Sequence, residues 1–177
     1  MKPNVVILTI GRCGSSVLTK MMLEAGWKCP RADDEFSEHR DLRAINSRVV
    51  VGAPFPVAEA QSVVDALPAP WVLKDPRLSW TLKHWQPLLE KATPSLVLIT
   101  RDLQAVAESF RRQKWGRDGE RGYELRGVTL ADQERWCWSY FKAWPWGKLH
   151  VEYEQLHAAM RLFDTSRGVV EQLRQAI

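Results

Sequence analysis

The side chains of this chain that are best suited to chemistry lie in a short loop with two glycines. Gly11-Arg12-Cys13-Gly14-Ser15-Ser16 follows an apolar run at 4–10 and precedes a segment with helical apolar spacing. A strand, a tight loop and a helix N-terminus in this order form an anion site, because free backbone N–H groups and the helix dipole both face the loop. Arg12 adds a fixed positive charge, and Ser15 and Ser16 add hydroxyl donors that can also cap the helix. The loop therefore predicts a site for a phosphate-bearing ligand, with an ordinary strand-to-helix turn as the alternative.

The loop differs from the phosphate loop of nucleotide triphosphatases. That loop reads G-x-x-x-x-G-K-[ST], with the Lys on the phosphates and the Ser or Thr on Mg²⁺. Here no Gly-Lys pair is present, and the basic residue, Arg12, stands inside the loop. A small kinase is therefore an alternative that the motif disfavours.

Two further clusters carry charge at the ends of apolar runs. Arg101 follows the run 95–100, and Ser109 comes eight residues later along a predicted helix, so the two can grip a second phosphate. Lys74 is the last residue of the run 71–74, and Asp75 follows it. Lys74 can reach a transferred anionic group, and Asp75 can accept a proton. Surface ion pairs are the plain alternative for both clusters.

Short apolar runs alternate with helical periodicity along the chain, which is typical of an α/β fold with a parallel sheet. We expect strands at 4–10, 71–74, 95–100 and 149–153, and helices at 16–25, 42–51, 57–66, 78–91, 103–114, 130–143 and from Gln155 onward. The Gly-rich, charged stretch 115–128 predicts a mobile loop. Ligands of such sheets bind beyond the carboxyl ends of the strands. The three clusters all follow strands, so we expect them to meet in one site.

Size and composition fit one soluble domain over residues 1–177. Hydrophobic residues make up 45% of the chain, which argues against disorder, and Lys and Arg exceed Asp and Glu by 25 to 21. The net charge of +4 suits an anionic ligand. It is too weak to indicate nucleic acid, although the basic stretch 111–126 with Trp115 has the composition for stacking and phosphate contact. The three cysteines show no metal-ligand spacing, and their sparse, odd number predicts a reducing, cytoplasmic setting. No apolar stretch is long enough to span a membrane.

Taken together, these motifs resemble the sulfotransferase family that uses 3′-phosphoadenosine 5′-phosphosulfate (PAPS). Arg12-Cys13-Gly14-Ser15-Ser16 is similar to that family's [K/R]-S-G-T-[ST] loop, with Cys for Ser and Ser for Thr. Arg101 to Ser109 is similar to its R-D-P-x-x-V-A-x-S segment. Weaker similarities are Lys74-Asp75-Pro76-Arg77, the acidic segment from Glu38 with Asn46 after it, and Val151 to Leu156, which resembles a late Y-E-x-L strand end.

The resemblance implies a three-layer α/β/α fold of the P-loop nucleotide-hydrolase type. It implies that Gly11 to Ser16 bind the 5′-phosphosulfate of PAPS, that Arg101 and Ser109 hold the 3′-phosphate, and that adenosine 3′,5′-bisphosphate (PAP) is the product. It further implies a metal-independent, in-line sulfuryl transfer, in which Arg12 and Lys74 stabilise charge on the leaving phosphate.

The acceptor and its general base are left open by the sequence. Glu38 is the first candidate base, on the acidic-segment similarity, with Asp75 and His39 next. Small-molecule, glycan and lipid acceptors with a hydroxyl or amine all remain, and the oligomeric state cannot be inferred. Val17 stands where the family often has an aromatic residue that stacks on adenine. A catalytically degenerate module that binds the nucleotide without turnover is the main alternative function.

Overall fold

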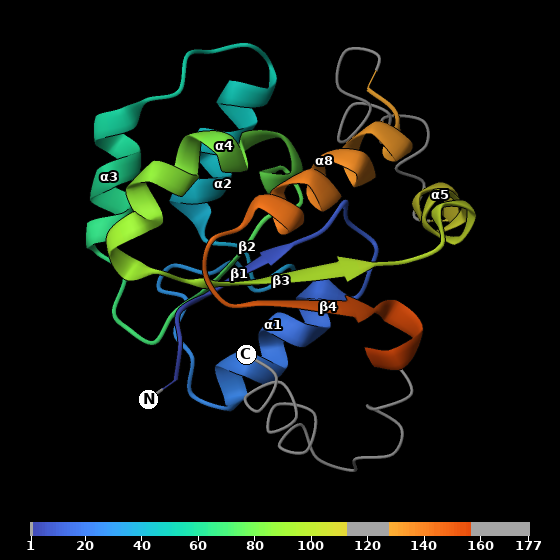
Figure 1. The fold of residues 1–177 in the computed structure, drawn as a ribbon, viewed down its shortest axis with the longest axis horizontal. Helices are drawn as coiled ribbons and strands as arrows, with labels where there is room; N and C mark the ends of the chain where they lie inside the picture. Colours follow the sequence, from blue (N-terminus) through green and yellow to red (C-terminus); the bar gives the residue numbers. More distant parts are fainter. Residues whose placement is uncertain (1, 113–127, 157–177) are drawn as a thin grey trace.

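The computed structural model describes residues 2–112 and 128–156, and these form a parallel sheet with helices packed around it (Figure 1). The strands run in the order β2-β1-β3-β4. In chain order the elements are β1 (Val5–Leu8), α1 (Ser15–Glu24), α2 (Arg40–Val50), α3 (Val57–Asp65), β2 (Val72–Lys74), α4 (Leu78–Leu89), a 3-10 turn (Glu90–Ala92), β3 (Ser95–Thr100), α5 (Leu103–Arg112), α8 (Leu130–Ala143) and β4 (Lys148–Glu152).

The predicted α/β class with a parallel sheet is confirmed. Each strand and helix expected in the described ranges is present; β3 and α8 have the expected bounds, and the others differ only at their ends. The loop expected at 115–128 lies outside the described residues except for its last position, and so does nearly all of the helical tail expected from Gln155. None of the helices in the described ranges is long and apolar enough to cross a membrane.

The middle of the sheet is buried because β1 pairs on both sides. Val5 is in register with Val72 of β2 and with Ser95 of β3, all in parallel. All four residues of β1 are buried, as expected of continuous apolar strands covered on both faces. Figure 1 shows α1 on one side of the sheet and α4 with α8 on the other. Helices from both sides supply large core side chains, among them Leu18 and Trp85.

The connectivity places a crevice between the carboxyl ends of β1 and β3. From β1 the chain proceeds through α1, which packs against β2, whereas from β3 it proceeds toward α8 and then β4 on the opposite edge. The loops that leave the two adjacent strands therefore diverge. In open parallel sheets this change of direction is where ligands bind.

Candidate functional site

A cavity of about 340 Å³ lies at this point of the sheet. Every residue of the loop from Gly11 to Ser16 lines it except Cys13, and Glu38, Lys74, Arg101 and Ser109 line it as well. The structure thus brings together the three clusters that the sequence placed at strand ends. Of the predicted site residues, Cys13, Asp75 and His39 do not line this cavity.

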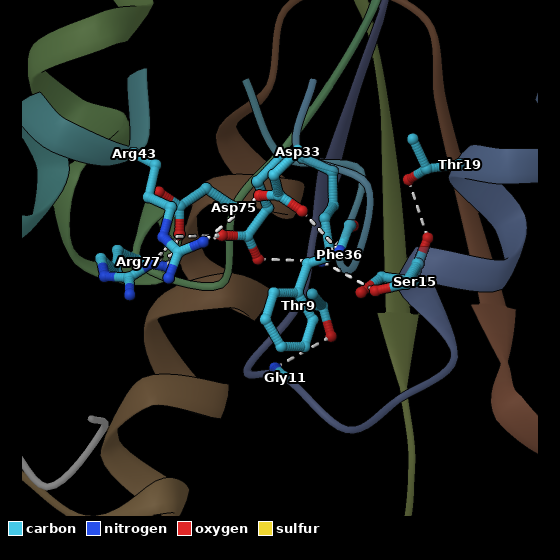
Figure 2. Close-up of polar contacts among 12 residues, drawn as sticks. Thr9, Gly11, Ser15, Thr19, Asp33, Phe36, Arg43, Asp75 and Arg77 are labelled. Carbon is cyan, nitrogen blue, oxygen red and sulfur yellow. Dashed lines mark hydrogen bonds and ion pairs between the residues drawn. The ribbon is translucent and has the colours of Figure 1, made fainter. Parts of the chain in front are cut away.

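The loop after β1 has the backbone shape of an anion-binding turn. Gly11, Arg12 and Gly14 have φ values of 90°, 54° and 79°, in the left-handed region. Left-handed residues are typical of the tight turns that form anion-binding concavities. Cys13 is buried behind the loop, where its thiol donates to the carbonyl of Gly11 at 3.0 Å. Thr9 accepts from the N–H of Gly11 at 3.3 Å, a contact drawn in Figure 2.

Helix α1 begins at Ser15, and the expectation that Ser15 or Ser16 caps it is wrong. Gly14 is the N-cap residue, and no side chain caps the helix. The first intrahelical bond runs from the N–H of Leu18 to the carbonyl of Gly14, at 3.1 Å. The N–H groups of the first turn therefore have no acceptor within the helix and remain for a ligand. Ser16 contributes its hydroxyl instead, which accepts from Lys74 Nζ at 3.0 Å.

Gly14 also permits a close approach of Tyr153 to the loop. A Cβ atom at Gly14 would lie 3.0 Å and 3.1 Å from two ring carbons of Tyr153. The same ring lies under the guanidinium of Arg101, 4.0 Å from its centre. The loop, the end of β3 and the residue after β4 are therefore packed as one unit.

Arg101 and Ser109 are joined to the loop through Arg12. Arg12 Nε donates to Ser109 Oγ at 3.0 Å, and Arg101 Nη1 donates to the carbonyl of Arg12 at 3.0 Å. Arg101 Nε is buried and has no hydrogen-bond partner in the part of the chain that the structure describes. A buried polar donor without an acceptor is costly, so it indicates a ligand atom or a water at this position.

Lys74 extends from the end of β2 into the cavity wall. Its side chain is 2% exposed, and its ammonium group donates to Ser16 Oγ, to the carbonyl of Phe36 and to Glu38 Oε1, at 3.0–3.1 Å. These three acceptors fix the cation close to the first turn of α1. A cation at this place can act on an anion held by the loop.

Glu38 faces Lys74 from the segment before α2. Its side chain is 4% exposed. Burial is the first cause that raises the pKa of Glu38, and the charge of Asp75 is the second, whereas Lys74 and Arg77 oppose the rise. A carboxylate whose pKa lies above its usual range is a stronger base near neutral pH.

Asp75 and His39, the other base candidates, have structural partners. Asp75 is fully buried and accepts hydrogen bonds from Arg77 and Asn46. His39 caps α2, where its side chain accepts from the N–H of Leu42 at 3.4 Å, and burial lowers its pKa. Among the three, Glu38 alone lines the cavity.

Sequence reasoning missed several lining residues. Tyr153, Phe36 and Arg112 all face the cavity. In the sequence, Tyr153 belongs to the segment that resembles a Y-E-x-L strand end, which gives it no role of its own. Phe36 lies in an irregular polar segment without the periodicity that would predict its position. Asn46 was noted beside Glu38, but its contact with Asp75 depends on the packing of α2 against α4.

The cavity is electropositive. Four cationic side chains (Arg12, Lys74, Arg101 and Arg112) and one carboxylate, Glu38, line it within the described residues. Such a balance attracts anionic ligands. Residues 2–112 and 128–156 contain no cluster of three or more His, Cys, Asp or Glu side chains that could hold a metal ion.

Comparisons of the chain with models of protein families, with curated proteins and with solved structures find no match. What the site binds is therefore inferred from its own residues. The N-terminal turn of α1, three arginines and a buried lysine in one cavity are suited to a ligand with more than one anionic group.

Proposed function

We propose that this chain is a sulfotransferase that moves a sulfuryl group from PAPS to a hydroxyl or amine of an acceptor. The observation that carries the proposal is the convergence of Arg12, Lys74 and Arg101 on one cavity at the carboxyl ends of three neighbouring strands. PAPS bears two anionic groups, and the cavity offers cations from the ends of β2 and β3 and from the glycine loop between them.

The loop and the end of β3 would divide the donor between them. The first turn of α1 and Arg12 would hold the 5′-phosphosulfate, because the N–H groups of that turn have no acceptor within the helix and Arg12 belongs to the loop that precedes it. Arg101 and Ser109 would hold the 3′-phosphate. The buried Nε of Arg101, which has no partner among the described residues, supports this assignment because an anionic oxygen would satisfy it.

The chain's other groups have roles that follow from their positions. PAPS would supply a sulfuryl group whose bond to the 5′-phosphate oxygen breaks as the acceptor oxygen or nitrogen bonds to sulfur, and the electron pair leaves on that phosphate oxygen. Lys74 and Arg12 would stabilise the negative charge at the leaving oxygen. Glu38 would take the proton of the acceptor, because its carboxylate faces the cavity and burial raises its pKa.

We further propose that residues 1–177 form one domain of the three-layer, P-loop nucleotide-hydrolase type and that the protein acts in the cytoplasm. The glycine loop between β1 and α1 and the helices on both sides of the parallel sheet support the fold assignment. The acceptor would be a small molecule, a glycan or a lipid rather than a nucleic acid.

Thermal unfolding with added PAP tests the proposal. Ligand that binds only the folded state raises the melting temperature, and 100-fold excess over the Kd contributes about 2.7 kcal/mol. We expect Arg101→Ala to lose most of this shift. Arg111→Ala is the matched control, because Arg111 is an exposed arginine on the same helix as Ser109 that does not line the cavity.

Two results would redirect or refute the proposal. A shift with ATP and Mg²⁺ but none with PAP up to the millimolar range would favour a kinase and refute the sulfotransferase. A PAP shift without transfer of ³⁵S-labelled sulfate from PAPS to phenol, sugar or lipid acceptors would support a nucleotide-binding module without turnover.

A further inference from the structure

Asn46 is a buried amide whose orientation is fixed by its neighbours. It is 0% exposed, and its Oδ1 accepts from Thr81 Oγ1 at 2.7 Å and from Trp85 Nε1 at 2.8 Å. An indole N–H can only donate, so the oxygen of the amide must face Trp85. The amide nitrogen therefore points the other way and donates to Asp75 Oδ2 at 2.9 Å.

Asp75 is surrounded by donors. Its second oxygen, Oδ1, accepts from the backbone N–H of Arg77 at 2.9 Å and from Arg77 Nη1 at 2.8 Å. Three donors, one of them cationic, suit the ionised carboxylate, which only accepts. Asn46 and Asp75 thus anchor the guanidinium of Arg77 from within the core.

Arg77 stands between Asp75 and Glu38. Its Nη1 lies 2.8 Å from Asp75 Oδ1 but 3.6 Å from Glu38 Oε2. Arg43 Nε also lies 3.7 Å from that oxygen, and Figure 2 shows Arg43 and Arg77 beside each other with Asp75 next to Arg77. Lys74 bonds the other oxygen, Oε1. Within the described residues, no donor is therefore within hydrogen-bond distance of Glu38 Oε2.

We propose that Asn46 and Asp75 are positioning residues that hold Arg77 back from Glu38, so that Glu38 Oε2 remains able to accept the proton of the acceptor. This inference rests on the proposed function, in which Glu38 is the base. Without Asp75, Arg77 would turn its guanidinium onto Oε2 in a bidentate pair, the geometry that Arg and carboxylates prefer. The oxygen that should receive the proton would then be occupied by a permanent cation.

The charges around Glu38 agree with this arrangement. Lys74 approaches from β2, Arg77 and Asp75 from the turn before α4, and Arg43 from α2, where Asp33 holds Arg43 at 3.3 Å. Burial raises the pKa of Glu38 most, and the charge of Asp75 raises it further, against the lowering by Lys74 and Arg77. Loss of Asp75 removes the opposing charge and brings a cation closer, and both changes lower that pKa.

A titration of the Glu38 carboxyl by ¹³C NMR in the ligand-free chain of residues 1–177 tests the inference. We expect Asp75→Asn, which removes the charge and keeps the shape, to move the Glu38 titration to lower pH. Asn46→Leu should move it in the same direction by less, because Asp75 keeps its charge. Arg77→Met should move it to higher pH, since one opposing cation is gone.

Thr81→Val is the matched control. It removes the hydroxyl that bonds Asn46 and the backbone carbonyl of Arg77. Trp85 still orients the amide, and Asp75 still holds the guanidinium of Arg77, so the Glu38 titration should match the wild type. An unchanged titration in folded Asp75→Asn would overturn the inference. Where Asp75→Asn does not fold, unchanged titrations in Asn46→Leu or Arg77→Met would do the same.

A parallel titration of the wild type with PAP separates this inference from the proposed function. Absence of PAP binding would count against the sulfotransferase. The NMR comparison uses the ligand-free chain, so it would still decide whether Asn46 and Asp75 control Glu38.

Discussion

Replacement of Lys74 by Met tests whether the cation at the end of β2 is required to keep Glu38 buried. The two side chains are 2% and 4% exposed, and their charged atoms lie 3.0 Å apart. Lys74→Met keeps an unbranched chain of similar length but removes the three hydrogen bonds of the ammonium group. Among the described residues, the cations left near Glu38 are then Arg77 and Arg43, at 3.6 Å and 3.7 Å.

Removal of one partner of a buried ion pair typically costs about 3–5 kcal/mol, because the other charge is left without compensation. The two remaining arginines reduce that penalty, so we expect the lower end, about 3 kcal/mol of unfolding free energy. For a chain of this size such a loss lowers the melting temperature by about 6–12 °C. The double variant Lys74→Met/Glu38→Gln should be more stable than Lys74→Met alone, because no buried charge is orphaned.

Urea unfolding at pH 7, followed by circular dichroism, measures the free energy of unfolding of the wild type and of both variants. Two results would refute the reasoning. One is Lys74→Met within about 1 kcal/mol of the wild type, a range typical of exposed pairs. The other is a double variant that is less stable than Lys74→Met, which would mean that the orphaned carboxylate is not the source of the cost.

Three further predictions concern the loop, the base and a thiol. Gly14→Ala should cost roughly 1–2 kcal/mol of stability for the left-handed backbone alone and should displace Tyr153, so PAP should raise the melting temperature by less than in the wild type. Gly52→Ala, at an exposed glycine with φ 101°, is the control and should keep the full PAP shift. Equal PAP shifts in the two variants would contradict this prediction. Because the folded state raises the pKa of Glu38, its stabilising contribution is present below the ordinary pKa of 4.5 and is lost as pH rises through the folded value. The stability of Glu38→Gln relative to the wild type should therefore increase from pH 4 to pH 7 in urea unfolding, and a flat or falling difference would be inconsistent with a raised pKa. Burial raises the pKa of Cys13 to about 11, so iodoacetamide should label this thiol slowly at pH 8 in the native protein and rapidly in urea. Peptide mass spectrometry measures the labelling, and rapid labelling of the native protein would show that the thiol is accessible.

The strands and the strand-end clusters were predictable because they depend on local sequence. The run 95–100 is apolar throughout and forms β3 over the same residues. A parallel sheet places the carboxyl ends of its strands at one edge, so Lys74 and Arg101 could be expected near the glycine loop before any contact was known. Their distances and partners required the fold.

The remaining site features depend on contacts that no local pattern encodes. The cap of α1 was predicted wrongly. Serine is common as an N-cap residue, so the sequence favours Ser15 or Ser16 there, but the left-handed Gly14 is the N-cap in the structure. Asn46 reaches Asp75 across 29 positions of sequence, and Tyr153 meets Arg101 only after β4 pairs with β3. Such contacts arise from helix packing and strand order.

The central claim is a grip on two anionic groups, and calorimetric titration with two nucleotides tests it most directly. PAP carries the 3′-phosphate that Arg101 would hold, whereas adenosine 5′-monophosphate lacks it. A charge-assisted hydrogen bond contributes about 1.5–3 kcal/mol, so we expect the wild type to bind PAP at least about tenfold more tightly. In Arg101→Ala the ratio should fall toward one. Equal affinities in the wild type, or a ratio unchanged in Arg101→Ala, would contradict the account.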